Sequence, residues 1–192
     1  MEKEFWENRY ESQQTGWDLG QPSPPLMELM KTIHQKDAKI LIPGCGSAHE
    51  AKALMNMGFN QVWLIDISEH AVEQIRKKLP EFPQKHLICE DFFHWKEGDF
   101  DIILEQTFFC AIPPVMRENY AKTMHQKLKP GGILQGVLFN REFEGGPPFG
   151  GHEAEYKKIF ETYFHFILWE SCPCSIPPRA NSELWIQLKR KD

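Results

Sequence analysis

The stretch Lys39–Ser47, KILIPGCGS, constrains the fold of this chain more than any other. A short apolar run, Ile40–Ile42, is followed by two glycines that flank Cys45, and apolar residues at positions 51, 54 and 55 then mark one face of a helix. Ser47 is predicted to cap that helix, with Glu50 closing a capping box. A strand, a glycine turn and a helix begin the nucleotide site of doubly wound α/β proteins, because the glycines let a ligand approach the backbone and the helix offers free N–H groups.

Strand and helix patterns alternate along the rest of the chain. Apolar runs predict strands at 39–43, 61–66, 86–89, 100–104, 133–139, 164–170 and 183–189. Helical spacing predicts helices at 47–57, from Ser68, at 114–127 and around Tyr156–Tyr163. The link 171–182 is too short for a crossover helix, so the last two strands are expected to be antiparallel.

These patterns predict an α/β fold. We expect a single doubly wound, mostly parallel, seven-stranded Rossmann-like sheet with an antiparallel last strand. Residues 1–192 are expected to form one domain, in which residues 1–37 are a helical leader outside the sheet.

Composition and charge exclude several classes of protein. The 192 residues carry a formal net charge of −5, which argues against nucleic acid or an anionic membrane surface as the partner. No apolar run approaches the ~20 residues that span a bilayer, and the opening MEKEFW lacks the features of a signal peptide. Five scattered cysteines fit reduced thiols better than a disulfide framework or a metal site. These features fit a cytoplasmic protein without a metal. We also expect a monomer or weak dimer that acts on a small molecule.

Polar groups follow four successive strands of the predicted sheet. They are Gly44 and Gly46, Asp66, Asp91 with Phe92, and Glu105 with Gln106. Because ligands of open α/β sheets bind beyond the carboxyl ends of the parallel strands, we expect these groups to share one site. Asp66, twenty positions after Gly46, is suited to accept hydrogen bonds from both hydroxyls of a ribose. The sequence thus predicts a nucleoside site at this edge.

Two observations distinguish between nucleoside cofactors. The dinucleotide fingerprint needs a third glycine at the position that His49 occupies, which weakens an NAD site. Asp91 can accept a hydrogen bond from the exocyclic amine of adenine, while the Phe92 N–H donates to the ring. Carboxylates and aromatic faces also favour a sulfonium cation. The set favours S-adenosylmethionine (SAM) as the cofactor, and an NAD-dependent oxidoreductase is the alternative.

The leader carries three large aromatic side chains outside the predicted sheet, Trp6, Tyr10 and Trp17. In one interpretation they fasten the leader to the domain. In the other they cover a bound ligand and exclude water. Taken alone, the aromatic pattern leaves both interpretations open.

Several motifs follow one another over nearly the whole chain: FWENRY (5–10), TGWDLGQPSP (15–24), LIPGCGSAHE (41–50), LIDIS (64–68), CEDFF (89–93), EQTFFCAIPPVMRENYA (105–121), LKPGG (128–132) and PPRANSELW (177–185). Together they resemble the thiopurine S-methyltransferase-like family of class I SAM-dependent methyltransferases, nearest its halide/thiol methyltransferase branch. The aromatic leader with its W-D-x-G segment and the TFFCAIPP stretch are more specific to that family than the G-x-G turn is.

The resemblance implies SAM as the cofactor and assigns its binding residues. These are Trp6, Tyr10, Trp17, Gly44, Gly46, Asp66, Ile67, Asp91, Phe92, Glu105 and Gln106. With the family pattern in view, the leader aromatics are expected to cover the cofactor. The substrate side would be built by Phe108, Phe109 and Phe149 with the Gly/Pro-rich loop 140–151, and by Arg179 from the final loop. Gln106 stands where family members have Tyr or Arg, and Tyr10 stands where a second Trp is common.

The expected reaction is direct in-line transfer of a methyl group to a small soft nucleophile, above all a thiol. No catalytic residue is assigned: His49 and His152 are interpreted as histidines without a catalytic partner, and Cys110 as a packed apolar side chain. A non-catalytic protein that binds SAM is the second alternative.

Overall fold

The computed structural model describes residues 3–192, and its centre is one seven-stranded sheet with the strand order β3-β2-β1-β4-β5-β7-β6. Strands β1 to β5 are parallel, and β7 is antiparallel to both of its neighbours, β5 and β6. The predicted fold class is therefore confirmed. The strands are β1 (Ile40–Pro43), β2 (Val62–Asp66), β3 (Leu87–Cys89), β4 (Phe100–Gln106), β5 (Leu128–Phe139), β6 (Phe164–Ser171) and β7 (Glu183–Arg190).

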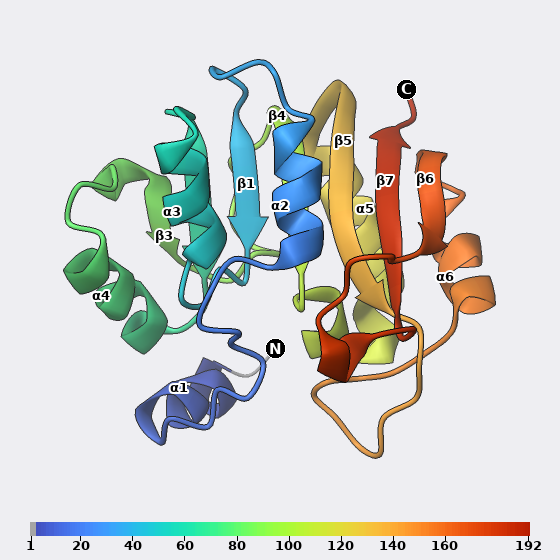
Figure 1. Cartoon of the computed structure of the whole chain (residues 1–192), viewed down its shortest axis with the longest axis horizontal. Coiled ribbons are helices and arrows are strands. Elements are labelled where there is room, and N and C mark those ends of the chain that lie inside the picture. Colours follow the sequence, from blue (N-terminus) through green and yellow to red (C-terminus); the bar gives the residue numbers. More distant parts are fainter. Residues whose placement is uncertain (1–2) are drawn as a thin grey trace.

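Helices cover both faces of the sheet (Figure 1). Helices α2, α3 and α4 lie on one face, and α5 and α6 lie on the other. Their bounds are α1 (Lys3–Glu11), α2 (Pro24–Lys31), α3 (His49–Asn56), α4 (Glu69–Lys78), α5 (Arg117–Lys127) and α6 (Glu153–Phe160). None of the helices among residues 3–192 has the length and apolar character that a bilayer crossing needs.

The alternation of side chains along β1 divides the core into two layers. Ile40 and Ile42 are buried in the cluster that contains α2, α3 and α4 residues, while Leu41 is buried in the cluster with Tyr120 of α5 and Phe160 of α6. Successive residues of a strand point to opposite faces, so a strand covered on both sides must be apolar throughout. All four residues of β1 are buried, which fixes the strand that leads into the glycine turn.

The predicted start of α3 is wrong. The helix begins at His49, preceded by Ala48 in the left-handed region at φ 54°, and Ser47 makes no capping bond. The Ser47 hydroxyl donates to Asp18 instead, and the Glu50 carboxylate accepts the backbone N–H of Ser23 at 2.9 Å. The capping box does not form because polar groups of the leader use both of its members.

Helix α1 lies apart from the two layers, beyond the edge at which β1 ends (Figure 1). None of its residues, 3–11, is buried. Its firmest contact is with the start of α4, where the Glu7 carboxylate accepts the Ser68 hydroxyl at 3.0 Å and the His70 N–H at 3.2 Å. A carboxylate at a helix N-terminus satisfies free N–H groups and interacts favourably with the helix dipole. This cap holds the leader over the carboxyl edge of the sheet.

Candidate functional site

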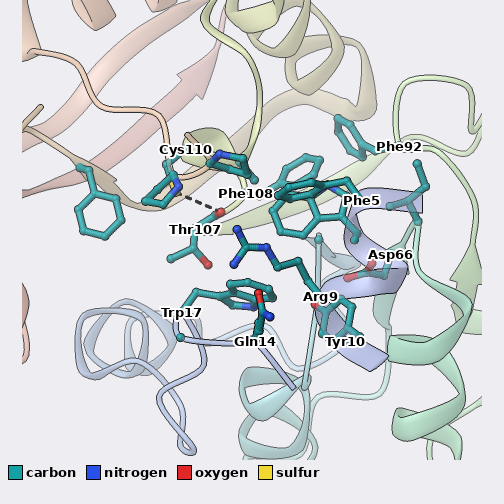
Figure 2. Close-up of a pocket in the computed structure, with 18 of the residues that line it drawn as sticks. Phe5, Arg9, Tyr10, Gln14, Trp17, Asp66, Phe92, Thr107, Phe108 and Cys110 are labelled. Atoms are coloured by element: carbon teal, nitrogen blue, oxygen red, sulfur yellow. Dashed lines mark hydrogen bonds between the residues drawn. The ribbon is translucent and has the colours of Figure 1, made fainter. Parts of the chain in front are cut away.

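A cavity of about 410 Å³ lies at the carboxyl edge of the parallel strands. Its volume is within the range of small-molecule and cofactor sites. The leader, the ends of β1, β2 and β4, the loop 140–151 and the link 171–182 all contribute to its wall (Figure 2). The predicted residues that the structure brings to this wall are Trp6, Tyr10, Trp17, Gly44, Asp66, Ile67, Asp91, Phe92 and Arg179. We call the sheet-edge residues Gly44, Asp66, Asp91, Phe92 and Phe108 the floor, and residues 3–23 with loop 140–151 the roof.

The glycine turn forms one part of the floor. Gly44 has φ +58°, and a Cβ at this position would lie 2.5 Å from Cδ2 of Phe108. Any other residue would therefore be strained in its backbone and would displace the aromatic ring below the cavity. The position requires glycine for both reasons.

Asp66 at the end of β2 joins the glycine turn to α4. Its Oδ2 accepts the Gly46 N–H at 2.9 Å, and its Oδ1 accepts the Ser68 N–H at 3.0 Å. Burial raises the pKa of this carboxyl, and the backbone N–H groups that it accepts oppose that shift. The side chain reaches the cavity wall while it fixes the geometry of the turn. The sequence predicted that Asp66 lies at the ligand site but not that it fixes the glycine turn.

Asp91 and Phe92 occupy the floor after β3. The Asp91 carboxylate accepts the Phe93 N–H at 2.8 Å, and a quarter of the side chain (25%) is exposed. The Phe92 ring packs edge-to-face on Phe108, with the ring centroids 5.2 Å apart. An acceptor beside an aromatic face is the pairing that an adenine base needs.

Glu105 does not line the main cavity. Its carboxylate lies beneath the floor and accepts the N–H groups of Phe108 at 2.8 Å and Phe109 at 2.9 Å, together with the Tyr120 hydroxyl. Burial raises the pKa of Glu105 to about 7, against the lowering effect of these three hydrogen bonds. The residue holds the turn after β4 instead of facing a ligand.

Gly46 and Gln106 lie beside a smaller cavity of about 50 Å³ that shares Trp17, Gly44 and Thr107 with the main one. Among residues 3–192 neither the nitrogen nor the oxygen of the buried Gln106 amide has a hydrogen-bond partner. Leaving such a group unpaired costs roughly 1–3 kcal/mol, so polar atoms of a ligand would be favoured here. This is the strongest indication in the structure that something polar binds next to the glycine turn.

The three leader aromatics meet in the roof. Trp17 packs edge-to-face against Trp6 and Tyr10, with ring centroids 5.5 Å and 5.7 Å away, and all three rings line the cavity. Figure 2 shows Trp17 and Tyr10 on the side of the cavity opposite Phe108. The rings pack on one another and line the cavity, and their covering of a bound cofactor stays a prediction.

Asp18 attaches the roof to the glycine turn. Its carboxylate accepts the Ser47 hydroxyl and lies 2.7 Å from the Nε2 of His49. His49 therefore has a carboxylate partner, and this contact joins the leader to the glycine turn, while the absence of a catalytic role for His49 stays a prediction. Burial raises the pKa of Asp18, but the hydrogen bonds from Ser47, Gly20 and His49 outweigh it and leave the pKa lowered.

The turn after β4 directs two neighbouring side chains to different places, one to the cavity and one to the core. Thr107 adopts a left-handed conformation at φ 58°, after which Phe108 faces the cavity and Phe109 enters the core. Phe109 packs against Tyr120 and Tyr156, with both pairs of ring centroids 5.0 Å apart. Its predicted place on the substrate side is wrong. The nearby Cys110 is buried as predicted, but it also lines the cavity, and its thiol donates to the Thr107 carbonyl at 3.3 Å.

Phe149 is also absent from the residues that line the cavity within the described chain. Its N–H donates to the Cys110 carbonyl at 2.6 Å, which ties the loop 140–151 to the turn after β4. The apolar wall on this side comes from Phe139, Phe143 and two prolines, Pro147 and Pro148. Phe139 ends β5 at the same edge as the acidic groups, so strand position could have indicated it.

Arg179 lines the cavity as expected, but its guanidinium already has partners. Nη2 donates to the Trp17 carbonyl at 3.0 Å, Nη1 lies 3.5 Å from the Glu183 carboxylate, and the group stacks over Phe139 at 5.3 Å. Arg179 belongs to residues 171–182 and therefore connects this segment to the roof. Two further arginines of the wall, Arg9 and Arg141, were not predicted.

The fold is that of solved methyltransferases. The 1,6-didemethyltoxoflavin N1-methyltransferase of Burkholderia thailandensis, solved with S-adenosylhomocysteine bound, aligns with a TM-score of 0.75 at 15% identity, over 99% of this chain and 87% of that one. A SAM-dependent methyltransferase of Aquifex aeolicus aligns with a TM-score of 0.69 at 16% identity, over 96% and 98% of the two chains. The fold is therefore that of the class I SAM-dependent methyltransferases.

Sequence comparison gives the family. The probable thiol methyltransferase 2 of Arabidopsis thaliana is 38% identical over 159 residues, 80% of this chain and 70% of that protein. Thiocyanate methyltransferase 1 of the same plant is 32% identical over 189 residues, 95% and 83% of the two chains. The thiopurine S-methyltransferase (TPMT) family matches residues 1–182, and the chain belongs to this family. The predicted SAM-dependent methyltransferase class is confirmed, and the NAD-dependent alternative is not supported.

Proposed function

We propose that this chain transfers the methyl group of SAM to a small soft nucleophile, foremost a thiol, by direct in-line displacement. The observation that carries the proposal is the cavity itself. It is enclosed between a glycine turn with two strand-end acids and a roof of aromatic rings. A roof that excludes water suits transfer to a nucleophile that water would otherwise compete with.

The cofactor would lie on the floor. In this proposal Asp66 binds the ribose, and Asp91 with Phe92 binds the adenine, with Ile67 beside them. Gly44, Gly46 and the unpaired amide of Gln106 would hold the methionyl part. Trp6, Tyr10 and Trp17 would close over it, and Glu105 would act indirectly by fixing the turn that carries Phe108.

The protein would act by aligning the nucleophile with the methyl group and by excluding water, not by covalent catalysis. Bound SAM supplies an activated methyl group on a sulfonium. Phe108, Phe139 and Phe143 then provide an apolar wall for the acceptor. A typical thiol has a pKa of ~8.5, so a few per cent is thiolate at neutral pH, and no dedicated base is required. Holding nucleophile and methyl in line can supply most of the rate enhancement.

The methyl acceptor and the cellular compartment are part of the same proposal. The relatives named as thiol and thiocyanate methyltransferases support a small thiol or a soft inorganic anion as the acceptor. The five cysteines are unpaired, which supports a reducing compartment such as the cytoplasm. We propose a monomer or weak dimer that acts there on small molecules and not on nucleic acid.

Turnover with a panel of acceptors tests the proposal. Purified protein is incubated with SAM and with small thiols, hydrosulfide or thiocyanate, and S-adenosylhomocysteine (SAH) and the methylated product are quantified by mass spectrometry. We expect equal amounts of both products with at least one acceptor. Tight binding of SAM without turnover on any acceptor would support a non-catalytic SAM-binding protein. No thermal stabilisation by either SAM or SAH would contradict the site itself, since a ligand at 100 times its Kd stabilises by ~2.7 kcal/mol.

A further inference from the structure

Arg9 of α1 projects its guanidinium into the cavity without an anionic partner. The side chain is one of those lining the wall, and Figure 2 shows it extending from the leader between Trp17 and Phe108, toward Thr107. Its side chain makes a cation–π contact, with the guanidinium carbon 5.1 Å from the ring centroid of Phe5. No carboxylate within residues 3–192 lies at salt-bridge distance from it.

The buried arginines of the chain, Arg117 and Arg179, already have polar partners. Arg117 donates to the carbonyls of Phe149 and Gly150 at 3.2 Å and 2.7 Å and pairs with Glu155. Arg179 is engaged by Trp17 and Glu183, as described above. Arg9 is partly buried, and a guanidinium on the wall of the cavity with no carboxylate partner in the described part of the chain has its N–H donors available for an anionic ligand.

Acidic and basic side chains lie on different parts of the cavity wall. The carboxylates of Asp66 and Asp91 belong to the part of the wall assigned to the adenosine, and Glu90 lines the wall next to Asp91 in the chain. In Figure 2 the Arg9 guanidinium points away from Asp66. Arg141, exposed on the loop 140–151, adds a second guanidinium at the rim, stacked over Phe143 at 4.8 Å. In a chain with a net charge of −5, such a local cationic region would attract an anionic acceptor to the cavity.

We propose that Arg9 binds the acceptor in its anionic form, either a thiolate or a soft inorganic anion such as thiocyanate, and that Arg141 assists its entry. The inference rests on the proposed function and names the charge state of its substrate. A guanidinium is weakly hydrated and presents several donors in a plane, which suits large, weakly hydrated anions. Arg9 would therefore determine specificity for ionised acceptors.

The charge balance of the transfer explains product release. The lone pair of the anion forms the new bond to the methyl carbon, and the electron pair of the methyl–sulfur bond stays on the sulfur of the cofactor. The anion becomes a neutral methylated product, and the sulfonium becomes a neutral thioether. The attraction between Arg9 and the acceptor is lost with the anionic charge, so the product leaves a site that held its precursor.

The carboxylate of the methionyl part of the cofactor is the other anion that Arg9 could bind, and calorimetry separates the two. SAH is titrated into the wild type, Arg9→Gln, Arg9→Lys, Arg141→Gln and the surface control Arg76→Gln, and thiocyanate is then titrated into each SAH-saturated protein. Arg76 pairs with Glu73 on the exposed side of α4. The binding of thiocyanate to the SAH complex involves no turnover. This titration therefore tests the role of Arg9 independently of whether the chain methylates any acceptor.

For Arg9→Gln we expect thiocyanate binding to weaken about tenfold or more while the Kd of SAH changes less than about twofold. Arg9→Lys should recover part of the loss, Arg141→Gln should cost about two- to threefold, and Arg76→Gln should match the wild type. Equal weakening of SAH and thiocyanate would instead assign Arg9 to the cofactor carboxylate. Unchanged thiocyanate binding in a folded Arg9→Gln protein would overturn the inference.

The pH profile of kcat gives a second measurement. A cation beside a thiol lowers its pKa in the complex, so removing the cation should move the ascending limb of the profile to higher pH with a thiol acceptor. Thiocyanate is an anion throughout this range and should show no such movement. A role of Arg9 in folding alone would leave both profiles in place.

Discussion

The floor and the roof of the cavity are held by different forces. The floor follows from strands in the core: Asp66 is 6% exposed, Phe92 4% and Phe108 5%. The leader part of the roof, residues 3–23, has no buried residue in α1 and depends on a few polar contacts, chiefly Glu7 with α4, Asp18 with the glycine turn, and Arg179 with the Trp17 carbonyl. Weakly packed segments open at low free-energy cost, whereas core elements open only with global unfolding.

The difference implies a division of roles. The floor is formed before any ligand arrives, so its residues should determine cofactor affinity and stability. The roof should close on the ligand and open for exchange, so its residues should determine KM and product release. The following changes, ordered from the largest expected effect, would sharpen or break this comparison.

Asp66→Ala should have the largest effect, because it removes the proposed ribose acceptor and the bonds to the N–H groups of Gly46 and Ser68. We expect the Kd of SAH to rise about 100-fold, or ~3 kcal/mol, by calorimetry. Asp66→Asn keeps the shape of the side chain and one acceptor oxygen, so its Kd for SAH should lie between those of the wild type and Asp66→Ala. Asp37→Ala, on the exposed surface, is the matched control. An unchanged Kd in a folded Asp66→Ala protein would remove this residue from the site.

Glu105→Gln should change the pH dependence of stability. Because burial raises the pKa of Glu105 from 4.5 to about 7, the folded chain keeps a proton in this range that the unfolded chain has lost. The free energy of unfolding should therefore fall as pH rises from about 4.5 to 7, by roughly 3 kcal/mol from this group. Urea denaturation at several pH values measures the slope, which should be shallower in Glu105→Gln. The exposed Glu81→Gln should keep the wild-type slope.

Arg179→Gln should act on the roof without much effect on the floor. The change removes the donor to the Trp17 carbonyl, so we expect KM for SAM to rise about tenfold and hydrogen exchange to quicken in residues 15–20. Arg179→Lys, which keeps the charge opposite Glu183, controls for loss of that pair. If exchange in this segment stays at the wild-type rate, the roof is held by other contacts.

Glu7→Gln should have the smallest effect. Although burial raises its pKa, the N–H groups of Glu69 and His70 and the Ser68 hydroxyl lower it overall. A carboxyl with a lowered pKa stabilises fully above its ordinary value of 4.5 and loses this contribution as pH falls below it. We expect KM for SAM to rise about two- to threefold at neutral pH and the fluorescence of Trp6 and Trp17 to change on acidification in the wild type alone. Identical acid titrations of both proteins would place the attachment of α1 elsewhere.

Much of the floor could be predicted because it depends on strand order alone. An apolar run must be a buried strand, parallel strands end at one edge, and the residue after each strand is then at the ligand site. Gly44, Asp66, Asp91 and Phe92 were placed correctly at the cavity for this reason, and the antiparallel β7 followed from the short link before it.

The errors arose where backbone torsions or distant partners decide. Phe108 and Phe109 are equivalent in the sequence, and only the left-handed Thr107 sends the first to the cavity and the second to the core. Ser47 has the pattern of a cap, yet Asp18, far away in the chain, takes its hydroxyl. Arg9 shares its turn of helix with the leader aromatics, but its lack of a carboxylate partner within residues 3–192 is visible only once the chain has folded.

The amino-acid sequence by itself determined the α/β sheet, the glycine turn and the edge at which the ligand-binding groups gather, because these follow from hydrophobic periodicity and chain direction. The tertiary structure alone decided which side chains face the cavity and which of them are already paired. Those properties depend on contacts between segments that are distant in the sequence, and local pattern contains no information about such contacts.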